Sequence, residues 1–191
     1  MNFLAHAYLS GEDEEILIGN FIADHVKGKQ FLQYSEGIAK GIVLHRLIDD
    51  FTDQHKIVKQ SKARLRDKHR HYASVIVDIF YDHFLATNWS DFHHQDLPTY
   101  SQTIHQIISK YEFLLPEKSL HFFQYMLHNQ IFDTYTRVEG IHKVLTRMSH
   151  RTPFSSGMEN ASESLLTYYQ EFQEEFYAFF PLFIDFIADR K

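Results

Sequence analysis

Residues 75–85 read VIVDIFYDHFL, and this stretch sets the fold class that we expect for the whole chain. A helix drawn through it carries apolar side chains on nearly every side, and a helix of that kind is buried. Asp78 and Asp82 lie four residues apart on one face, so both carboxylates are expected to leave water together. Burying them requires a cation, a dense set of hydrogen-bond donors, or Arg or Lys partners from another helix.

Helical periodicity continues on both sides of this stretch. Only 7 Gly and 4 Pro interrupt the chain, and no Asn-Gly or Asp-Gly hairpin is present. We expect helices over 10–28, 38–53, 56–85, 100–114, 119–132, 136–148 and 159–187, the last bent at Pro181. No linker or internal repeat divides the sequence. The sequence therefore predicts an all-α, single-domain helical bundle over residues 1–191.

Composition narrows the chemistry that the chain performs. With no cysteine, any bound metal must take nitrogen and oxygen ligands. The N-terminus lacks the basic region of a signal peptide, and the most apolar stretch, 176–188, is shorter than the roughly 20 residues of a membrane span. These features predict a cytoplasmic protein with no membrane segment. A net charge of −6 argues against a general nucleic-acid binder.

One segment departs from this acidic balance. Between positions 56 and 71, seven Lys and Arg residues are accompanied by a single acid, Asp67. Such a run is either a solvated helix face or a docking surface for an acidic partner. The basic residues that we consider for docking are Lys56, Lys59, Lys62, Arg64 and Arg66.

The stretch GIVLHRLIDDFTD at 41–53 places His45 and Asp49 one helical turn apart. Both fall at the edge of an apolar stripe, where an imidazole nitrogen and a carboxylate oxygen can meet one cation, although this spacing is also common in exposed pairs. Asp24 projects beside apolar neighbours on the first expected helix, and His6 lies in the apolar segment 3–9. Inward His or Asp side chains on four segments indicate one cation pocket between helices.

In their order and spacing, these segments resemble the acyl-carrier-protein phosphodiesterase family, a divergent relative of the HD-type phosphohydrolases. The likeness spans nearly the whole chain and rests on five motifs: MNFLAH at 1–6, GNFIADHVKG at 19–28, GIVLHRLIDDFTD at 41–53, DIFYDHFLATNWS at 78–90 and RMSHRTP at 147–153. The sequence departs from the ordinary HD pattern of adjacent His and Asp ligands, because Arg46 follows His45 and Asp49 comes a turn later.

The resemblance implies an HD-like fold and hydrolysis of the phosphodiester that joins 4′-phosphopantetheine to a serine of acyl carrier protein, within fatty acid biosynthesis. It also implies a divalent cation, typically manganese, with magnesium or iron as alternatives. The positions that match the family's motifs are His6, Asp24, His45, Asp49, Asp53, Asp78, Asp82 and His83.

Our hypothesis gives most of these positions a role. His6, Asp24, His45 and Asp78 ligate the metal. Asp49 and Asp82 orient ligands or accept the proton of the attacking water, Arg46 steadies the phosphate, and His83 protonates the leaving serine oxygen. Because acyl carrier proteins are strongly acidic, the resemblance favours docking as the role of the basic segment.

Two other functions share these features. An HD-type phosphohydrolase acting on nucleotides or other small phosphoesters would use the same metal site and add pockets for base and ribose. A carrier-protein-binding or helical scaffold module would keep the acids and histidines as structural groups and bind no metal. The 18 Phe and 11 Tyr residues either line a tunnel for pantetheine or fill the core.

Overall fold

Helices joined by loops and turns make up the residues that the computed structural model describes, 2–153 and 155–190. The α-helices are α1 (Phe3–Ser10), α2 (Glu14–Ile22), α3 (Glu36–Gln54), α4 (Lys56–His69), α5 (Ala73–Thr87), α6 (Leu97–Lys110), α7 (Glu117–Asn129), α8 (Ile131–Tyr135), α9 (Val138–Ser149), α10 (Ala161–Thr167) and α11 (Tyr169–Ala188). Short 3-10 helices connect several of them, and no strand occurs in these residues. The all-α prediction is confirmed, whereas the HD-like arrangement stays a prediction.

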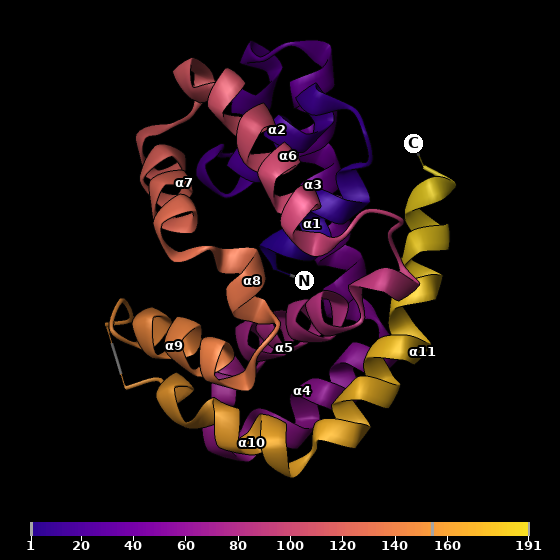
Figure 1. Ribbon diagram of the computed structural model, residues 1–191, viewed down its shortest axis with the longest axis vertical. Helices are drawn as coiled ribbons and strands as arrows, with labels where there is room; N and C mark the ends of the chain where they lie inside the picture. Colours follow the sequence, from indigo (N-terminus) through magenta and orange to yellow (C-terminus); the bar gives the residue numbers. More distant parts are fainter. Residues whose placement is uncertain (1, 154, 191) are drawn as a thin grey trace.

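Helix α5 runs through the middle of the molecule, and α1, α4, α8, α9 and α11 pack against it (Figure 1). Ile76, Phe80 and Phe84 on this helix have no exposed surface. From here the core continues through apolar side chains of every α-helix. Burial of residues 75–85 thus follows the sequence prediction for most side chains and for Asp82, but Asp78 keeps part of its surface exposed.

Several helix ends differ from those expected. Segment 3–9 is helical, and a separate helix, α2, begins after Asp13, whose side chain accepts a hydrogen bond from the Ile16 amide. The single helix expected over 56–85 is two helices, because α4 ends at His69 and Arg70 adopts a φ of 47°. Likewise, α10 and α11 replace the helix expected over 159–187, and α11 continues through Pro181. None of the helices described here combines the length and hydropathy of a bilayer-spanning segment.

Two glycines set the distance between α2 and α3. Gly19 on α2 faces Gly41 on α3, and a Cβ added at either position would collide with the backbone of the other helix. On Gly19 it would lie only 2.8 Å from the Gly41 Cα. This close approach brings Asn20 of α2 against His45 of α3, where the candidate site begins.

Candidate active site

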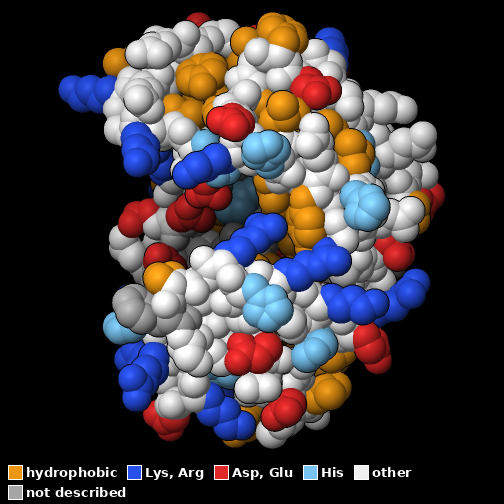
Figure 2. Space-filling model, turned by 90° about the vertical axis from the view of Figure 1, so that its left-hand side faces the viewer, with side chains coloured by type: hydrophobic (Ala, Val, Ile, Leu, Met, Phe, Trp, Pro, Cys, Tyr) orange, Lys and Arg blue, Asp and Glu red, His pale blue; other side chains and the backbone are white. Residues whose placement is uncertain are grey.

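A cavity of about 800 Å³ opens on one face of the molecule, with α1–α3 contributing to one part of its lining and α7–α9 to another. Figure 2 shows the hollow with acidic side chains on one wall and basic side chains at its rims. Apolar side chains, including Phe3, Val75 and Phe122, contribute much of the remaining lining. The cavity therefore combines a region of His and Asp side chains, an apolar surface and a basic region.

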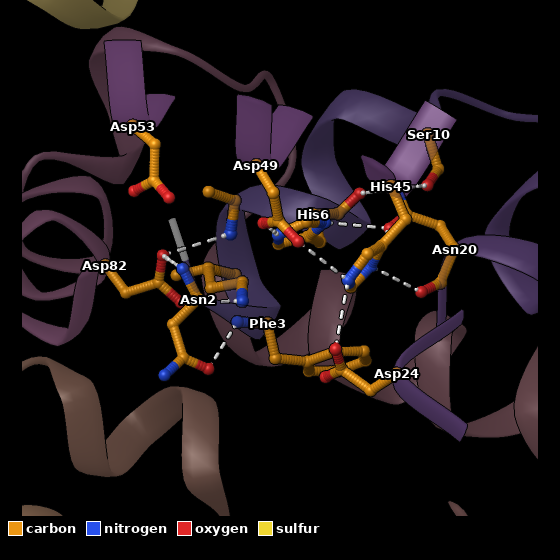
Figure 3. A network of polar contacts seen from close by, with 12 residues as sticks. Asn2, Phe3, His6, Ser10, Asn20, Asp24, His45, Asp49, Asp53 and Asp82 are labelled. Carbon is orange, nitrogen blue, oxygen red and sulfur yellow. Dashed lines mark hydrogen bonds and ion pairs between the residues drawn. The ribbon is translucent and has the colours of Figure 1, made fainter. Parts of the chain in front are cut away.

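His6, Asp24, His45 and Asp49 converge on the acidic wall (Figure 3). His6 comes from α1, His45 and Asp49 from α3, and Asp24 from the 3-10 helix Ala23–His25. Nε2 of His6 lies 3.3 Å from Oδ1 of Asp49, and Nε2 of His45 lies 3.2 Å from Oδ2 of the same carboxylate. Oδ1 of Asp24 lies 3.3 Å from the His45 Nε2. The two imidazoles thus present Nε2 toward carboxylates on one wall.

Asn20 orients both imidazole rings. Its side-chain Oδ1 lies 2.8 Å from Nδ1 of His6 and 2.9 Å from Nδ1 of His45. Its Nδ2 donates hydrogen bonds to the His6 carbonyl and to the Ser10 hydroxyl, which fixes the amide orientation. Since Oδ1 is an acceptor, Nδ1 must carry the proton in both rings, and Nε2 is left with a lone pair in the neutral form. Asn20 had no predicted role, although it lies within the GNFIADHVKG motif.

The electrostatic balance of the wall favours positive charge between its carboxylates. Burial lowers the pKa of His6 below its ordinary value. At His45, burial is outweighed by hydrogen bonds to Asp24 and Asp49, which raise the pKa to about 9. Burial acts to raise the pKa of Asp49, but its hydrogen bonds to His45 and His6 hold that pKa well below the usual range. The bond to His45 likewise lowers the pKa of Asp24.

This donor set fits a divalent cation. Ligand atoms about 2.1 Å from a six-coordinate ion lie about 3 Å from one another. The observed separations between Nε2 and carboxylate oxygens, 3.2–3.3 Å, are close to that value. One ligand atom each from His6, His45 and Asp49 also lies within 4.8 Å of the others. Mixed imidazole and carboxylate donors, with the other ring nitrogen fixed by a hydrogen bond, are typical of transition-metal sites.

Asp53 and Asp78 also line the cavity, outside the group of His6, His45 and Asp49. Oδ1 of Asp53 accepts a hydrogen bond from Lys62 at 2.6 Å. Asp78, on α5, is only partly buried. It therefore does not share the environment of Asp82, as the sequence pattern had led us to expect.

Three residues expected in the catalytic machinery do not line this cavity. Asp82 is fully buried and accepts hydrogen bonds from the backbone amides of Asn2, Leu4 and Ala5, at the start of α1. His83 is buried, with Nδ1 2.7 Å from the Tyr135 carbonyl and Nε2 3.0 Å from the Tyr169 hydroxyl.

Arg46, the third, donates to the Val26 carbonyl and lies over the Phe31 ring. These contacts give all three residues structural partners. The roles expected for them in proton transfer and phosphate binding stay predictions that this geometry does not support, because none of them lines the cavity that carries His6 and His45.

The basic residues of α4 divide into paired and exposed groups. The Arg64 guanidinium bonds to the buried Glu175 carboxylate and lies over the Phe172 ring. Lys62 is buried against Asp53. The side chains of Lys56, Lys59 and Arg66 remain exposed. Arg64 and Lys62 already pair with carboxylates of this chain, which argues against a role in docking. The charges of Lys56, Lys59 and Arg66 remain available to an acidic partner.

A second set of cations belongs to the cavity itself. Lys118 on α7 and Arg147 on α9 line it, together with Arg151 just beyond the end of α9. Arg147 and Arg151 come from the RMSHRTP motif, to which sequence analysis assigned no chemical role. Each of the five motifs therefore contributes at least one residue to the cavity, as His6, Asp24, His45, Asp78 and Arg147 illustrate.

Comparisons with known proteins agree with this picture. The family model described as acyl carrier protein phosphodiesterase matches residues 1–183. A protein of that name from Photorhabdus laumondii is 32% identical over 190 residues, covering 97% of this chain and 94% of that protein. The proteins of that name from Yersinia enterocolitica and Enterobacter sp. are 29% and 30% identical, with coverage of 100% and 95% of this chain and 100% and 94% of theirs.

No solved structure is similar enough to count as a match. Membership of a family therefore rests on sequence similarity along nearly the full chain. The motifs quoted above have in common that each contributes a residue to the cavity. The chain belongs to the acyl carrier protein phosphodiesterase family.

Proposed function

We propose that this chain hydrolyses the phosphodiester between 4′-phosphopantetheine and the serine of acyl carrier protein, with the help of a divalent cation. The observation that carries the proposal is the group of His6, His45 and Asp49, with Asp24 beside it, on the wall of a cavity. This group belongs to a chain whose relatives are named for that activity. The cavity is large enough for a pantetheine arm, since small-molecule sites commonly measure about 300–1,000 Å³.

His6, His45 and Asp49 would hold the cation, and Asp24 would complete or orient this set. A bound divalent cation supplies Lewis acidity and lowers the pKa of a water ligand. Manganese is the ion that we favour, with magnesium or iron as alternatives, because carboxylate oxygens suit manganese and magnesium and imidazole nitrogens suit iron. Asp49, expected from sequence to act beside the ligands, here becomes a ligand because its two oxygens face two imidazoles.

The reaction requires that water attack phosphorus while the bond from phosphorus to the serine Oγ breaks. The attacking water loses one proton and the serine oxygen gains one. Asp78, which the sequence led us to expect as a metal ligand, is instead our candidate to accept the first proton, because its carboxylate lies in the cavity outside the His6, His45 and Asp49 group. Asn20 contributes by holding both imidazoles with Nε2 directed at the carboxylates.

The partner that we propose is acyl carrier protein, in the cytoplasm and within fatty acid biosynthesis. Acidic proteins of this type suit the exposed cations of α4, Lys56, Lys59 and Arg66. Arg66 and Lys62 line a smaller hollow that shares Ser74 with the main cavity, so the exposed part of α4 adjoins the proposed active site. A carrier protein held there would place its serine near the cavity.

Incubation of holo acyl carrier protein with the purified chain and manganese tests the proposal directly. Mass spectrometry should show apo carrier protein and released 4′-phosphopantetheine, and His45→Ala should abolish the release without unfolding the protein. The matched control is His142→Ala, since His142 is an exposed histidine outside the cavity. Release of phosphate or nucleoside from nucleotides, with holo carrier protein left intact, would favour the alternative phosphohydrolase. Failure to bind any metal would favour a scaffold.

A further inference from the structure

Arg147 is a cation of the cavity to which the proposed reaction has assigned no role. Its Nη1 donates to the Tyr125 hydroxyl at 3.1 Å and to Oδ1 of Asn129 at 2.5 Å. Its guanidinium lies 5.3 Å from the centroid of the Tyr125 ring. Asn129 is itself held, because its Nδ2 donates to the Tyr125 carbonyl at 2.7 Å. The guanidinium is therefore oriented before any ligand arrives.

The partners of Arg147 leave its positive charge and one edge of its guanidinium available to a ligand. Tyr125 and Asn129 are uncharged, so neither neutralises the guanidinium. The two bonds from Nη1 account for both of that nitrogen's hydrogens, and no hydrogen bond within the described residues uses Nη2 or Nε. These two nitrogens form the edge that binds two oxygens of a phosphate side by side. Arg46, by contrast, donates from its guanidinium to a backbone carbonyl and does not line the cavity.

The carboxylates of the cavity favour such a group beside the proposed cation. Asp24, Asp49, Asp53 and Asp78 all line the cavity, and a phosphodiester carries one negative charge of its own. Repulsion between that charge and the carboxylates opposes binding unless cations surround the phosphate. Arg151, 5.5 Å from the same Tyr125 ring, and Lys118 add positive charge to the same cavity.

We propose that Arg147 binds the phosphodiester of the substrate through Nη2 and Nε, and that Tyr125 and Asn129 are the residues that position it. The inference rests on the proposed function, since it places the scissile phosphate between Arg147 and the wall of His6 and His45. It also gives the RMSHRTP motif a task in substrate binding. Helix α9 then supplies the basic half of a site whose other half comes from α1 and α3.

Two variants of Arg147 separate its charge from its geometry. Arg147→Lys keeps the positive charge but loses the planar fork, and Arg147→Ala loses both. We expect kcat/KM to fall about 30-fold or more in Arg147→Lys and further in Arg147→Ala, for both holo acyl carrier protein and bis(p-nitrophenyl) phosphate. Manganese affinity, measured by calorimetry, should stay within about twofold of wild type, because Arg147 contacts none of the proposed ligands. Lys143→Ala is the matched control, an exposed cation of α9 outside the cavity.

Binding of inorganic phosphate to the manganese-loaded protein gives a readout that does not depend on the natural substrate. We expect it to weaken about tenfold or more in Arg147→Ala and to stay unchanged in Lys143→Ala. Unchanged phosphate binding in Arg147→Ala would overturn the inference, as would a loss confined to the carrier protein, which would mark Arg147 as a docking residue. If wild type binds phosphate through Arg147 but leaves holo carrier protein intact, the proposed function fails while phosphate binding by Arg147 stands.

Discussion

At the scale of single residues, Asn20 decides how two histidines face the same carboxylate. One amide oxygen accepts from Nδ1 of His6 and of His45, and the rings stack with centroids 4.2 Å apart. Without that oxygen, His6 would lose the bond that fixes its tautomer and its rotation about χ2, and His45 would keep only the Asn20 main-chain carbonyl, 2.9 Å from its Nδ1. Asn20 thus supports the proposed metal site by orienting its imidazoles, without being one of the proposed ligands.

Replacing Asn20 with Ala should therefore lower manganese affinity about 10- to 100-fold, the usual effect of removing a group that orients metal ligands. Calorimetric titration of the metal-free protein measures this. Ser10→Ala is the control, since Ser10 bonds to Asn20 but to neither imidazole ring. It should change affinity far less. Equal affinities for wild type and Asn20→Ala would show that the rings keep their orientation without the amide.

The burial of Asp82 has a consequence for stability. Burial raises the pKa of this carboxyl to about 7 from an ordinary value of 3.8, even though amides of Leu4, Ala5 and Asn2 donate to it. Between these two values the folded protein binds more protons than the unfolded chain, so the contribution of Asp82 to stability falls as pH rises. Asp82→Asn removes the titration while keeping one acceptor oxygen.

We expect the unfolding free energy of wild type, relative to that of Asp82→Asn, to decline by up to about 4 kcal/mol between about pH 4 and pH 7 and to level off above. Urea unfolding of the metal-free protein across this range provides the measurement. A difference between the two proteins that stays constant with pH would contradict the raised pKa.

At this scale the sequence predicted much of the candidate site. Periodicity placed His6, Asp24, His45 and Asp49 on inward faces, and the structure brings these four together. Periodicity could not predict the role of Asp82, because a helical wheel shows that a side chain is buried but not which groups it contacts. The donors that meet Asp82 come from about 80 positions away, at the start of α1. Asp78 shares its helix face but lies beside the cavity, where burial is incomplete.

At the scale of elements, the crossing of α2 and α3 fixes the geometry of the site. Gly19 and Gly41 let the backbones of the two helices come into contact. Asn20 directly follows Gly19, and His45 comes one helical turn after Gly41, so this contact brings the two side chains together. Sequence analysis predicted both helices but not their spacing, since a glycine within a helix does not identify the surface it faces. The break between α4 and α5 escaped prediction for a related reason: the residue with positive φ is Arg70, with no Gly or Pro to mark it.

Gly41→Ala should separate these helices. Its methyl group would overlap the Ile16 carbonyl, and relief requires a backbone shift that costs about 1–3 kcal/mol of stability. The shift would also carry Asn20 away from His45, so manganese affinity should fall together with stability. Gly37→Ala is the control on the same helix, because the three atoms nearest to its methyl group belong to the Glu15 side chain and not to the backbone of another helix. Unfolding in urea and metal titration of both variants test this, and equal behaviour would refute it.

At the scale of the whole molecule, the cavity joins segments that lie far apart in the chain. The motifs near the N-terminus supply histidines and carboxylates, while Lys118, Arg147 and Arg151 come from positions more than 60 residues later. The fold class could be predicted because every segment shows helical periodicity. The pairing of an acidic wall with basic rims in one cavity could not, since it depends on how α7 and α9 pack relative to α3, and local pattern carries no information about that distance (Figure 2).

The exposed cations of α4 should govern how quickly an acidic partner arrives. Lys59→Glu combined with Arg66→Glu reverses two charges beside the cavity and leaves the Lys62–Asp53 and Arg64–Glu175 pairs in place. We expect kcat/KM for holo acyl carrier protein to fall about tenfold or more at low salt, because long-range attraction raises association rates by factors of 10 or more. Activity on bis(p-nitrophenyl) phosphate should not change, since neither residue lines the main cavity.

A matched pair of substitutions distinguishes local steering from net charge. Lys40→Glu with Lys110→Glu makes the same change in total charge at exposed positions on α3 and α6, where each lysine forms an ion pair with a glutamate near the surface. Such pairs contribute about 0–1 kcal/mol, so folding should survive. If attraction to α4 is local, this control should retain near wild-type kcat/KM on the carrier protein. The α4 variant should also approach wild type as salt rises, because the Debye length shrinks from about 10 Å at 0.1 M to about 3 Å at 1 M. Equal losses in both double variants, or a defect that persists at high salt, would mean that α4 does not guide the partner.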